Sequence, residues 1–350
     1  MKKTVLIVML LLSAFARTVF ANDKEVRIFI WSEYMDEFKM RDQFKKAYGI
    51  NAKIDIYENN EEMLAKLMAG GVSEYDIIVP SDYVIPSLIR NKLIQPLNKA
   101  KIPNLKNIMP MFAKTTYDPG GDYVAAYQWG TVGLMYNRKK ISDADAKSWA
   151  VLFDPKKQKG TFWLMDSVRD TMAMANMYLG FDMNTTNPAQ IKKSAELLTQ
   201  VKHSRYCRGF KPGVGAKNDV DANQADMAIV YNGDGMRAVI ADKKRLGFTI
   251  PKEGGEIWCD FMAIPAKAPN VENAYKWINF VLDAKIGAQV SNYNRYATPN
   301  QASVKYIIPM DLKSDEIYPG PETMKRLHYT KDLGSVNKIV DEAWTSVKSH

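Results

Sequence analysis

The chain has 350 residues, of which 46% are apolar and 25% charged, with 20 Gly and 16 Pro. These ordinary globular proportions exclude a disordered chain, a collagen and a coiled coil. The net charge of +9 comes from scattered Lys and Arg residues. A nucleic-acid surface would need a clustered basic patch, so no nucleic-acid partner is expected. At this length two domains are expected rather than one.

The N-terminus has the anatomy of a secretory signal peptide over residues 1–21. Lys2 and Lys3 precede an apolar run over 5–12, and Ala21 ends a segment typical of a cleavage site. An uncleaved anchor is disfavoured, because Arg17 interrupts a run much shorter than the roughly 20 residues that span a bilayer. Cleavage removes three basic residues and no acidic one, so the net charge falls from +9 to +6. No Cys lies near the cut, so we expect a periplasmic protein without a lipid anchor.

Cysteine and histidine are too sparse for a metal centre. Cys207 and Cys259 cannot complete a tetrahedral zinc site, and His203, His328 and His350 lie far apart without an HExxH motif. Neither a metal nor a cofactor is therefore expected. An exported protein can form disulfides, so a Cys207–Cys259 bridge stays possible, although a buried free thiol is favoured.

Strand-like and helix-like segments alternate along the chain. Strands are predicted at 25–31, 52–57, 75–81, 123–137, 160–166, 227–231 and 258–264. Helices are predicted at 33–48, 60–70, 82–92, 169–180, 188–202 and 271–282. This alternation predicts right-handed βαβ units and a mainly parallel sheet. No Gly/Ser-rich linker separates two halves, so two domains would be joined by several strand-like crossings, which suits a hinge.

Aromatic, acidic and hydroxyl residues recur where the predicted strands end. Examples are WSEY at 31–34, PSDY at 80–83, MDSVRD at 165–170, YNGDG at 231–235, WCD at 258–260 and YNRY at 293–296. Parallel sheets bind ligands at the carboxyl ends of their strands. Aromatic faces attract cations and carboxylates hold ammonium groups, so the pattern predicts a slot for an organic cation.

Each of these positions also has a purely structural interpretation. A Trp at a strand end belongs more often to the core or the rim than to a ligand site. Ser32, Ser81, Ser167 and Asp234 are equally typical of helix N-caps. Asp260 is harder to explain in this way, because a carboxylate within an apolar strand needs a partner. The repetition of the pattern at five or six strand ends favours the ligand site.

The segments FIWSEYMDEF, YENNEEMLAKL, YDIIVPSDYVIPSLI, KEGGEIWCDFMAIP and RYATPNQAS together resemble the spermidine/putrescine-binding periplasmic proteins of ABC-type importers. The similarity runs from about residue 24 to the C-terminus. It implies the two-domain α/β periplasmic binding protein fold of type II, with a mainly parallel sheet flanked by helices in each domain and a ligand cleft between the domains. The recognition residues it implies are Trp31, Ser32, Glu33, Tyr34, Ser81, Tyr83, Asp170, Tyr231, Trp258, Asp260 and Tyr296.

Three positions depart from the pattern of the spermidine-preferring members. Ser167 stands where they have a second carboxylate, Tyr231 where they have Trp, and Thr330 where they have Gln. We include Ser167 and Thr330 among the candidate ligand-binding residues. Asp82 is a further candidate, because it either replaces the missing charge or faces outward as a helix cap. The preference among putrescine, spermidine and spermine stays open.

The resemblance also implies an organisation and a role. The expected N-terminal domain comprises residues 22–131 and 256–300, and the C-terminal domain residues 132–255 and 301–350. The expected protein is a monomer, not an enzyme, that captures putrescine or spermidine and delivers it to an inner-membrane ABC permease.

Two other classes of function, a hydrolase and an anion receptor, compete with this role. A periplasmic hydrolase could use Asp170 and Asp260 for acid–base chemistry, but the chain has no GxSxG, P-loop, GxGxxG or metal motif. A receptor of the same fold for an anion would need Arg side chains and helix N-termini in the cleft. A receptor for another small organic cation is the nearest alternative.

Overall fold

The computed structural model describes residues 24–349. Its ten strands are β1 (Glu25–Trp31), β2 (Asn51–Tyr57), β3 (Ile77–Ile78), β4 (Val124–Asn137), β5 (Phe162–Met165), β6 (Cys207–Lys211), β7 (Met227–Tyr231), β8 (Leu246–Thr249), β9 (Gly255–Ala263) and β10 (Leu327–Tyr329). The predicted signal peptide lies outside the described residues.

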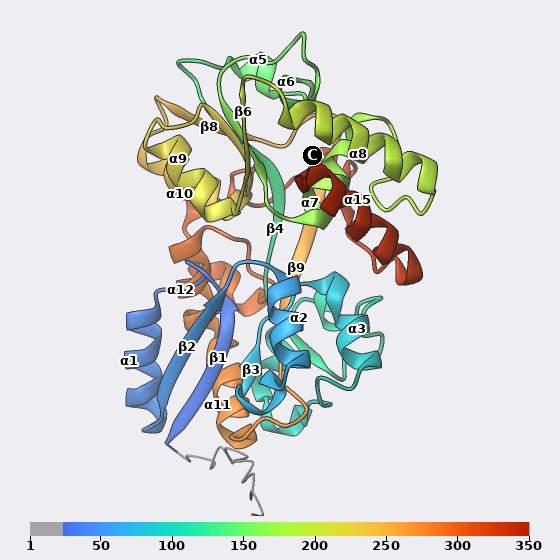
Figure 1. Ribbon diagram of the computed structural model, residues 1–350. Helices are drawn as coiled ribbons and strands as arrows, with labels where there is room; N and C mark the ends of the chain where they lie inside the picture. The colour runs from blue at the N-terminus through green and yellow to red at the C-terminus, as the bar shows by residue number, and fades with distance from the viewer. Residues whose placement is uncertain (1–23, 350) are drawn as a thin grey trace, which may run out of the picture.

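Two lobes meet at a waist, with one part of the sheet in each (Figure 1). The lower lobe contains β1, β2 and β3 with helices α1 (Glu37–Tyr48), α2 (Asn60–Met68), α3 (Ile85–Arg90), α4 (Pro110–Ala113) and α11 (Val271–Val281). The upper lobe contains β5 to β8 with helices α5 (Asp143–Ala146), α6 (Ala150–Phe153), α7 (Val168–Tyr178), α8 (Pro188–Lys202), α9 (Gly213–Asp221) and α10 (Asn232–Ala241).

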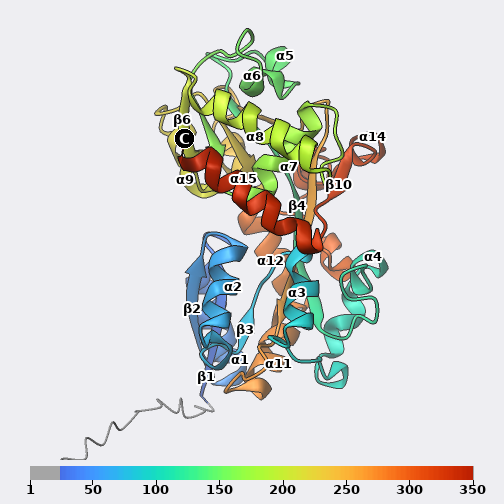
Figure 2. The same cartoon turned by 45° about the vertical axis from the view of Figure 1, so that its right-hand side comes forward.

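The C-terminal third returns to both lobes. Helix α12 (Ala284–Asn294) lies near the waist, and α13 (Pro309–Leu312), α14 (Pro321–Met324) and β10 follow it along the chain. Helix α15 (Asn337–Ser349) runs across the upper lobe towards α3, as Figure 2 shows. An ion pair of 2.7 Å between Arg90 at the end of α3 and Asp332 joins the lobes on this side. No helix of residues 24–349 is long and apolar enough to span a membrane.

The strand order is β2-β1-β3-β9-β4-β7-β5-β6. The outer pairs β1/β2, β1/β3, β5/β6 and β5/β7 are parallel, as predicted, whereas the long central strands β4 and β9 pair antiparallel with each other. Both central strands run through the waist (Figure 1). The strand-like crossings expected between two domains are thus β4 and β9, and the domain boundaries expected from the sequence stay a prediction.

The predicted elements occur close to their expected positions, and the apolar spacing explains why. Helix α11, for example, buries Ala274, Trp277, Ile278 and Val281, which follow the i, i+3, i+4, i+7 pattern of one helix face. The strand predicted at 75–81 is shorter, with only Ile77 and Ile78 in the ladder. The two cysteines are free thiols, with Cys259 buried in β9 and Cys207 partly buried in β6.

Close packing at the waist requires a glycine on β4. A Cβ atom added at Gly130 would lie 2.6 Å from the Trp258 ring and would also collide with the Asn232 side-chain oxygen. That oxygen accepts a hydrogen bond from the Thr131 backbone N–H at 3.0 Å. The approach of β4 to β9 and α10 therefore leaves no room for a side chain at this position.

Gly130→Ala is expected to lower the free energy of unfolding by about 1–3 kcal/mol, because overpacking displaces Trp258 and Asn232. Urea denaturation followed by circular dichroism measures the change. Gly215→Ala in α9 is the control, because its Cβ would meet only the flexible Lys211 side chain. Equal stability of the wild type and Gly130→Ala would contradict this account of the waist.

Candidate functional site

A pocket of about 710 Å³, its open mouth included, lies between the lobes. Its walls come from the loops after β1, β2 and β3 of the lower lobe, and from the starts of α7, α9 and α10 of the upper lobe. Strand β9 crosses its base. The ends of parallel strands thus converge on one cavity, as expected for an α/β fold.

Six acidic side chains line the pocket. They are Glu58, Glu61, Asp170, Asp234, Glu256 and Asp260. Across residues 24–349, no Lys, Arg or His belongs to this lining. The same range contains no group of three or more His, Cys, Asp or Glu that could hold a metal ion. The pocket is therefore strongly acidic, with no basic side chain in its wall to balance the charge.

Strand β9 supplies three of the lining residues at alternate positions. Side chains two residues apart share one face of a strand, so Glu256, Trp258 and Asp260 all point into the pocket, while Cys259 points away. All nine residues of β9 are buried. Glu256 and Asp260 on this strand are therefore shielded from water, although no basic side chain of the pocket lining balances their charge.

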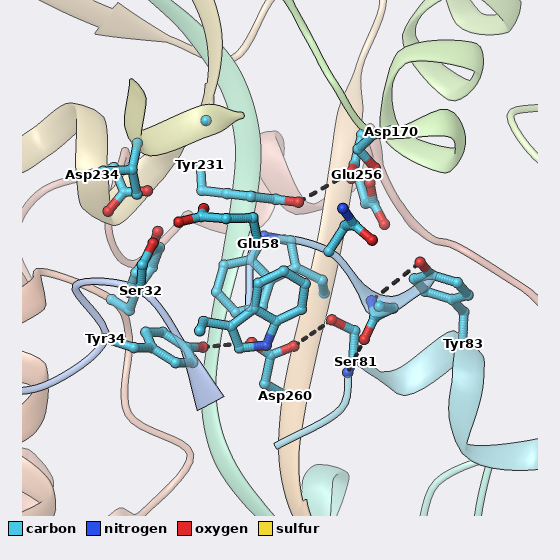
Figure 3. Close-up of a pocket in the computed structure, with 18 of the residues that line it drawn as sticks. Ser32, Tyr34, Glu58, Ser81, Tyr83, Asp170, Tyr231, Asp234, Glu256 and Asp260 are labelled. Atoms are coloured by element: carbon cyan, nitrogen blue, oxygen red, sulfur yellow. Dashed lines mark hydrogen bonds between the residues drawn. The ribbon is translucent and has the colours of Figure 1, made fainter. Parts of the chain in front are cut away.

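Asp260 lies at the base of the pocket and is 4% exposed. Its two carboxylate oxygens accept hydrogen bonds from the Ser81 hydroxyl at 2.6 Å and the Tyr34 hydroxyl at 2.7 Å (Figure 3). Burial nevertheless raises the pKa of Asp260 to about 7, and the nearby Asp170 adds to the effect. Two neutral donors thus orient the carboxylate without neutralising its charge.

Aromatic rings form a continuous wall beside Asp260. The Trp258 ring lies 5.7 Å from Tyr231 and 5.1 Å from Tyr296, both edge to face. Tyr296 in turn lies 5.4 Å from Tyr34, again edge to face. Trp31 lines the pocket as well, and its indole N–H donates to the Val79 carbonyl at 2.9 Å. These rings offer π faces to a cation and apolar surface to its carbon chain.

Two further acids stand in the first turns of upper-lobe helices. Asp170 is the third residue of α7, and its Oδ2 accepts a hydrogen bond from the Tyr231 hydroxyl at 3.1 Å. Asp234 is the third residue of α10, and burial raises its pKa to about 6, while the nearby Lys217 and a hydrogen bond with Tyr296 oppose that rise. Both acids therefore stand where the partial positive charge of a helix N-terminus meets the pocket.

Eleven of the fourteen residues predicted from the sequence line the pocket. They are Trp31, Ser32, Tyr34, Ser81, Tyr83, Ser167, Asp170, Tyr231, Trp258, Asp260 and Tyr296. Tyr83 donates to Glu61 at 3.2 Å and accepts from Asn60 at 3.1 Å, so it anchors the rim formed by the loop after β2.

Glu33 lies outside the lining, contrary to the sequence-based expectation. It has a φ of 51°, and its Oε2 pairs with Arg237 at 2.8 Å and Lys217 at 3.3 Å. These partners belong to α10 and α9, so the Glu33 carboxylate links the two lobes. Its charge is compensated within the protein.

Asp82 is also outside the lining, and it is completely buried. Its oxygens accept hydrogen bonds from the backbone N–H groups of Tyr83 at 2.7 Å and Cys259 at 3.0 Å. Burial raises its pKa well above the usual range. Asp82 therefore joins the loop after β3 to β9, and it neither faces the pocket nor caps a helix outwards.

Thr330 is the third expected residue that the structure places outside the lining. It is 1% exposed, and its hydroxyl donates to Glu256 Oε1 at 2.5 Å. The resemblance suggested Thr330 as a ligand contact. In the structure, Thr330 contacts Glu256, an acid outside the predicted set.

The lining residues outside the predicted set are Glu58, Asn59, Asn60, Glu61, Gly213, Val214, Asp234 and Glu256, although the strand-end segment YNGDG at 231–235 includes Asp234. Two signals were available for some of them. The period-2 pattern that puts Trp258 and Asp260 on one face of β9 extends back to Glu256. Residues 58–61 follow directly after β2, at the same edge of the sheet as the other pocket loops.

The two lobes, the mixed sheet and the pocket at its strand ends define an extracytoplasmic solute-binding architecture. The model of the bacterial extracellular solute-binding protein family matches residues 39–320. The chain belongs to this family. The match confirms the resemblance seen in the sequence and the expected fold class.

Named relatives and a solved structure are similar to this chain over nearly its whole length. The spermidine/putrescine-binding periplasmic protein of Escherichia coli is 33% identical over 336 residues, covering 94% of this chain and 93% of the relative. The putrescine-binding periplasmic protein SpuD of Pseudomonas aeruginosa is 31% identical, with the same coverages. The spermidine/putrescine ABC transporter substrate-binding protein PotD of Streptococcus pneumoniae superposes with a TM-score of 0.77 at 26% identity, over 93% of this chain and 99% of that one.

The buried acids of the pocket have a measurable consequence for stability. The folded-state pKa of Asp260 lies above its ordinary value of 3.8, so the stability it contributes is present below about pH 4 and is lost as the pH rises through about 7. Asp234 acts in the same direction up to about pH 6. The ligand-free protein should therefore lose stability from these groups between pH 5 and pH 7.5.

Asp260→Asn is expected to flatten the decrease in Tm between pH 5 and pH 7.5, because the variant has no charge to form at this position. Differential scanning calorimetry without ligand measures the change. Asp118→Asn is the matched control, since Asp118 is also buried but accepts hydrogen bonds from the Tyr123 and Val124 N–H groups outside the pocket. Identical pH profiles for the wild type and Asp260→Asn would contradict the raised pKa.

Proposed function

We propose that this protein is the extracytoplasmic binding component of an ABC-type importer and captures polyamines in the pocket between its lobes. The observation that carries the proposal is the composition of the pocket wall. Six carboxyl side chains and six aromatic rings line it, and no basic side chain of residues 24–349 takes part. Such a wall suits a flexible cation with an apolar chain.

The buried carboxylates favour a ligand with more than one charge. Each buried acid without a positive partner costs free energy, and a bound ammonium recovers part of that cost. Asp260 at the base and Asp170 at the start of α7 are separate acidic positions in one cavity. A diamine or triamine can pair with both, whereas a single amine cannot. Putrescine and spermidine, which the relatives' names specify, have this chemistry.

The same wall argues against the two other classes of function. An anion receptor needs Arg side chains at the ligand, and the lining contains none among the described residues. For a hydrolase, no observation beyond the presence of acids points to a reaction, and the relatives are named as binding proteins. We therefore propose a monomeric binder that is exported by residues 1–21 and delivers its ligand to an inner-membrane permease.

Within this proposal, the eleven lining residues expected from the sequence are the ligand contacts. Asp260, positioned by Ser81 and Tyr34, is the main anchor for one ammonium group. Trp258, Tyr296 and Tyr231 contact the methylene chain. Tyr83 and Asp170 lie further along the pocket.

Calorimetric titration of the mature protein tests this function. Putrescine or spermidine is expected to bind, whereas phosphate, sulfate and the uncharged butane-1,4-diol are not. Asp260→Asn should weaken polyamine binding by two to four decades in Kd, because breaking a buried charge pair on one side costs about 3–5 kcal/mol.

Asp118→Asn serves as the control for removing a buried acid outside the pocket. Absence of binding by every polyamine would overturn the proposed function. Binding that is equally strong in Asp260→Asn would keep the ligand class and remove Asp260 as its anchor.

A further inference from the structure

One carboxylate oxygen in the pocket, Oε2 of Glu256, lacks a hydrogen-bond donor among the described residues. Glu256 is 2% exposed, and its Oε1 accepts from the Thr330 hydroxyl at 2.5 Å. Among the described residues, no donor reaches its other oxygen, Oε2, which is fully buried. Because Glu256 lines the pocket, this oxygen without a donor belongs to the wall of the cavity in which a ligand would lie.

A second acid, Asp170, lies beside Glu256. The Asp170 carboxyl lies within hydrogen-bonding reach of it, and Figure 3 shows the two side chains together at one end of the pocket. The Tyr231 hydroxyl donates a hydrogen bond to Asp170 at 3.1 Å. Two ionised carboxylates cannot rest side by side in a buried site without a proton or a cation between them.

Among the described residues, the titratable groups that face Glu256 carry no positive charge. Asp170 on α7, Asp82 on the loop after β3, Tyr231 on β7 and Tyr117 on the loop before β4 are its titratable neighbours, and all are acidic or neutral. Burial and the Asp170 charge raise the pKa of Glu256 well above its usual range.

The basic residue nearest in sequence to this acid pair is already engaged. The Arg169 guanidinium, adjacent to Asp170, donates to the Asn337 side chain at 3.1 Å and to the Lys331 carbonyl at 2.7 Å. It therefore does not compensate Glu256.

We propose that Glu256 and Asp170 together form a second cation subsite, in which a ligand ammonium takes the place of a proton that Glu256 holds in the empty pocket. This inference rests on the proposed function and names a recognition residue beyond those implied by the resemblance. An ammonium has three N–H donors, so it can reach Glu256 Oε2 and an Asp170 oxygen at once. The displaced proton leaves to solvent, so charge within the subsite is conserved.

This subsite explains how the pocket tolerates Ser167. Ser167 lines the pocket but contributes no charge, at a position where the sequence resemblance implies a carboxylate. Glu256 brings a carboxylate to Asp170 from a different element, β9. The subsite therefore has two acids again and can hold one ammonium of a ligand whose other ammonium pairs with Asp260.

Calorimetry of Glu256→Gln tests the subsite. Titrations of spermidine and putrescine at pH 6.0, in two buffers with different ionisation enthalpies, give both Kd and the number of protons released. We expect Glu256→Gln to bind the preferred polyamine about 10- to 100-fold more weakly than the wild type. We also expect it to release about one proton fewer per ligand, because Asp260 contributes equally to both proteins.

Gln has the shape and the hydrogen-bonding capacity of a neutral Glu, so Glu256→Gln also gives a clear result if Glu256 does not bind an ammonium. If Glu256 stays protonated and only donates to Asp170, Glu256→Gln will bind within twofold of the wild type with unchanged proton release. That outcome overturns the subsite and leaves the proposed function intact. Failure of the wild type to bind any polyamine would instead contradict the proposed function.

Two control variants separate direct contact from indirect effects. Glu74→Gln removes the same charge from an exposed carboxylate outside the pocket, and it should leave affinity and proton release unchanged. Thr330→Val removes the donor that orients Glu256 Oε1 and should weaken binding less than Glu256→Gln does, with proton release retained. Thr330→Ser should restore wild-type affinity. Thermal unfolding of each ligand-free variant verifies that it is folded.

Discussion

Burying carboxylates without basic partners is the constraint on which the rest of this structure depends. Asp260 and Glu256 are each at most 4% exposed, and burial raises the pKa of both. In a protein interior such groups would ordinarily be paired with Lys or Arg. Here they are supported by neutral hydroxyls from Ser81, Tyr34 and Thr330. The protein thereby keeps negative charge oriented and uncompensated for a ligand.

The fold makes this arrangement possible because different elements supply the acids and the groups that orient them. Strand β9 provides one rigid face with an acid at each end and an indole between them. The lower lobe contributes the hydroxyls that orient Asp260, and the upper lobe contributes the helix starts that carry Asp170 and Asp234. Basic side chains such as Lys217 and Arg237 lie close by but pair with Glu33, which joins the lobes. These two side chains are therefore not part of the pocket lining, although they lie close enough to Asp234 to oppose the rise in its pKa.

Local pattern was sufficient to predict most elements and about half of the pocket from the sequence. The alternation in β9 gave the common orientation of Trp258 and Asp260, and the strand-end positions gave Tyr34, Ser81 and Tyr231. Glu33 was misplaced because its neighbours Lys217 and Arg237 are about 200 positions away in the chain. Glu256 was missed because the strand-end pattern covers only the last residues of each strand, whereas β9 crosses the whole base of the pocket. Contacts of this kind depend on how the lobes pack, which local sequence does not encode.

The central claim is that a ligand cation takes the place of protons on buried acids, and the pH dependence of affinity tests it most directly. Polyamine ammonium groups stay charged between pH 6 and pH 8, as the Lys ammonium does. Asp260, with a pKa of about 7 in the empty pocket, changes over this range from about one-tenth to about nine-tenths ionised. Titration of the wild type with its preferred polyamine should therefore give a Kd at least about tenfold weaker at pH 6 than at pH 8. A Kd that is the same at both pH values would contradict the account.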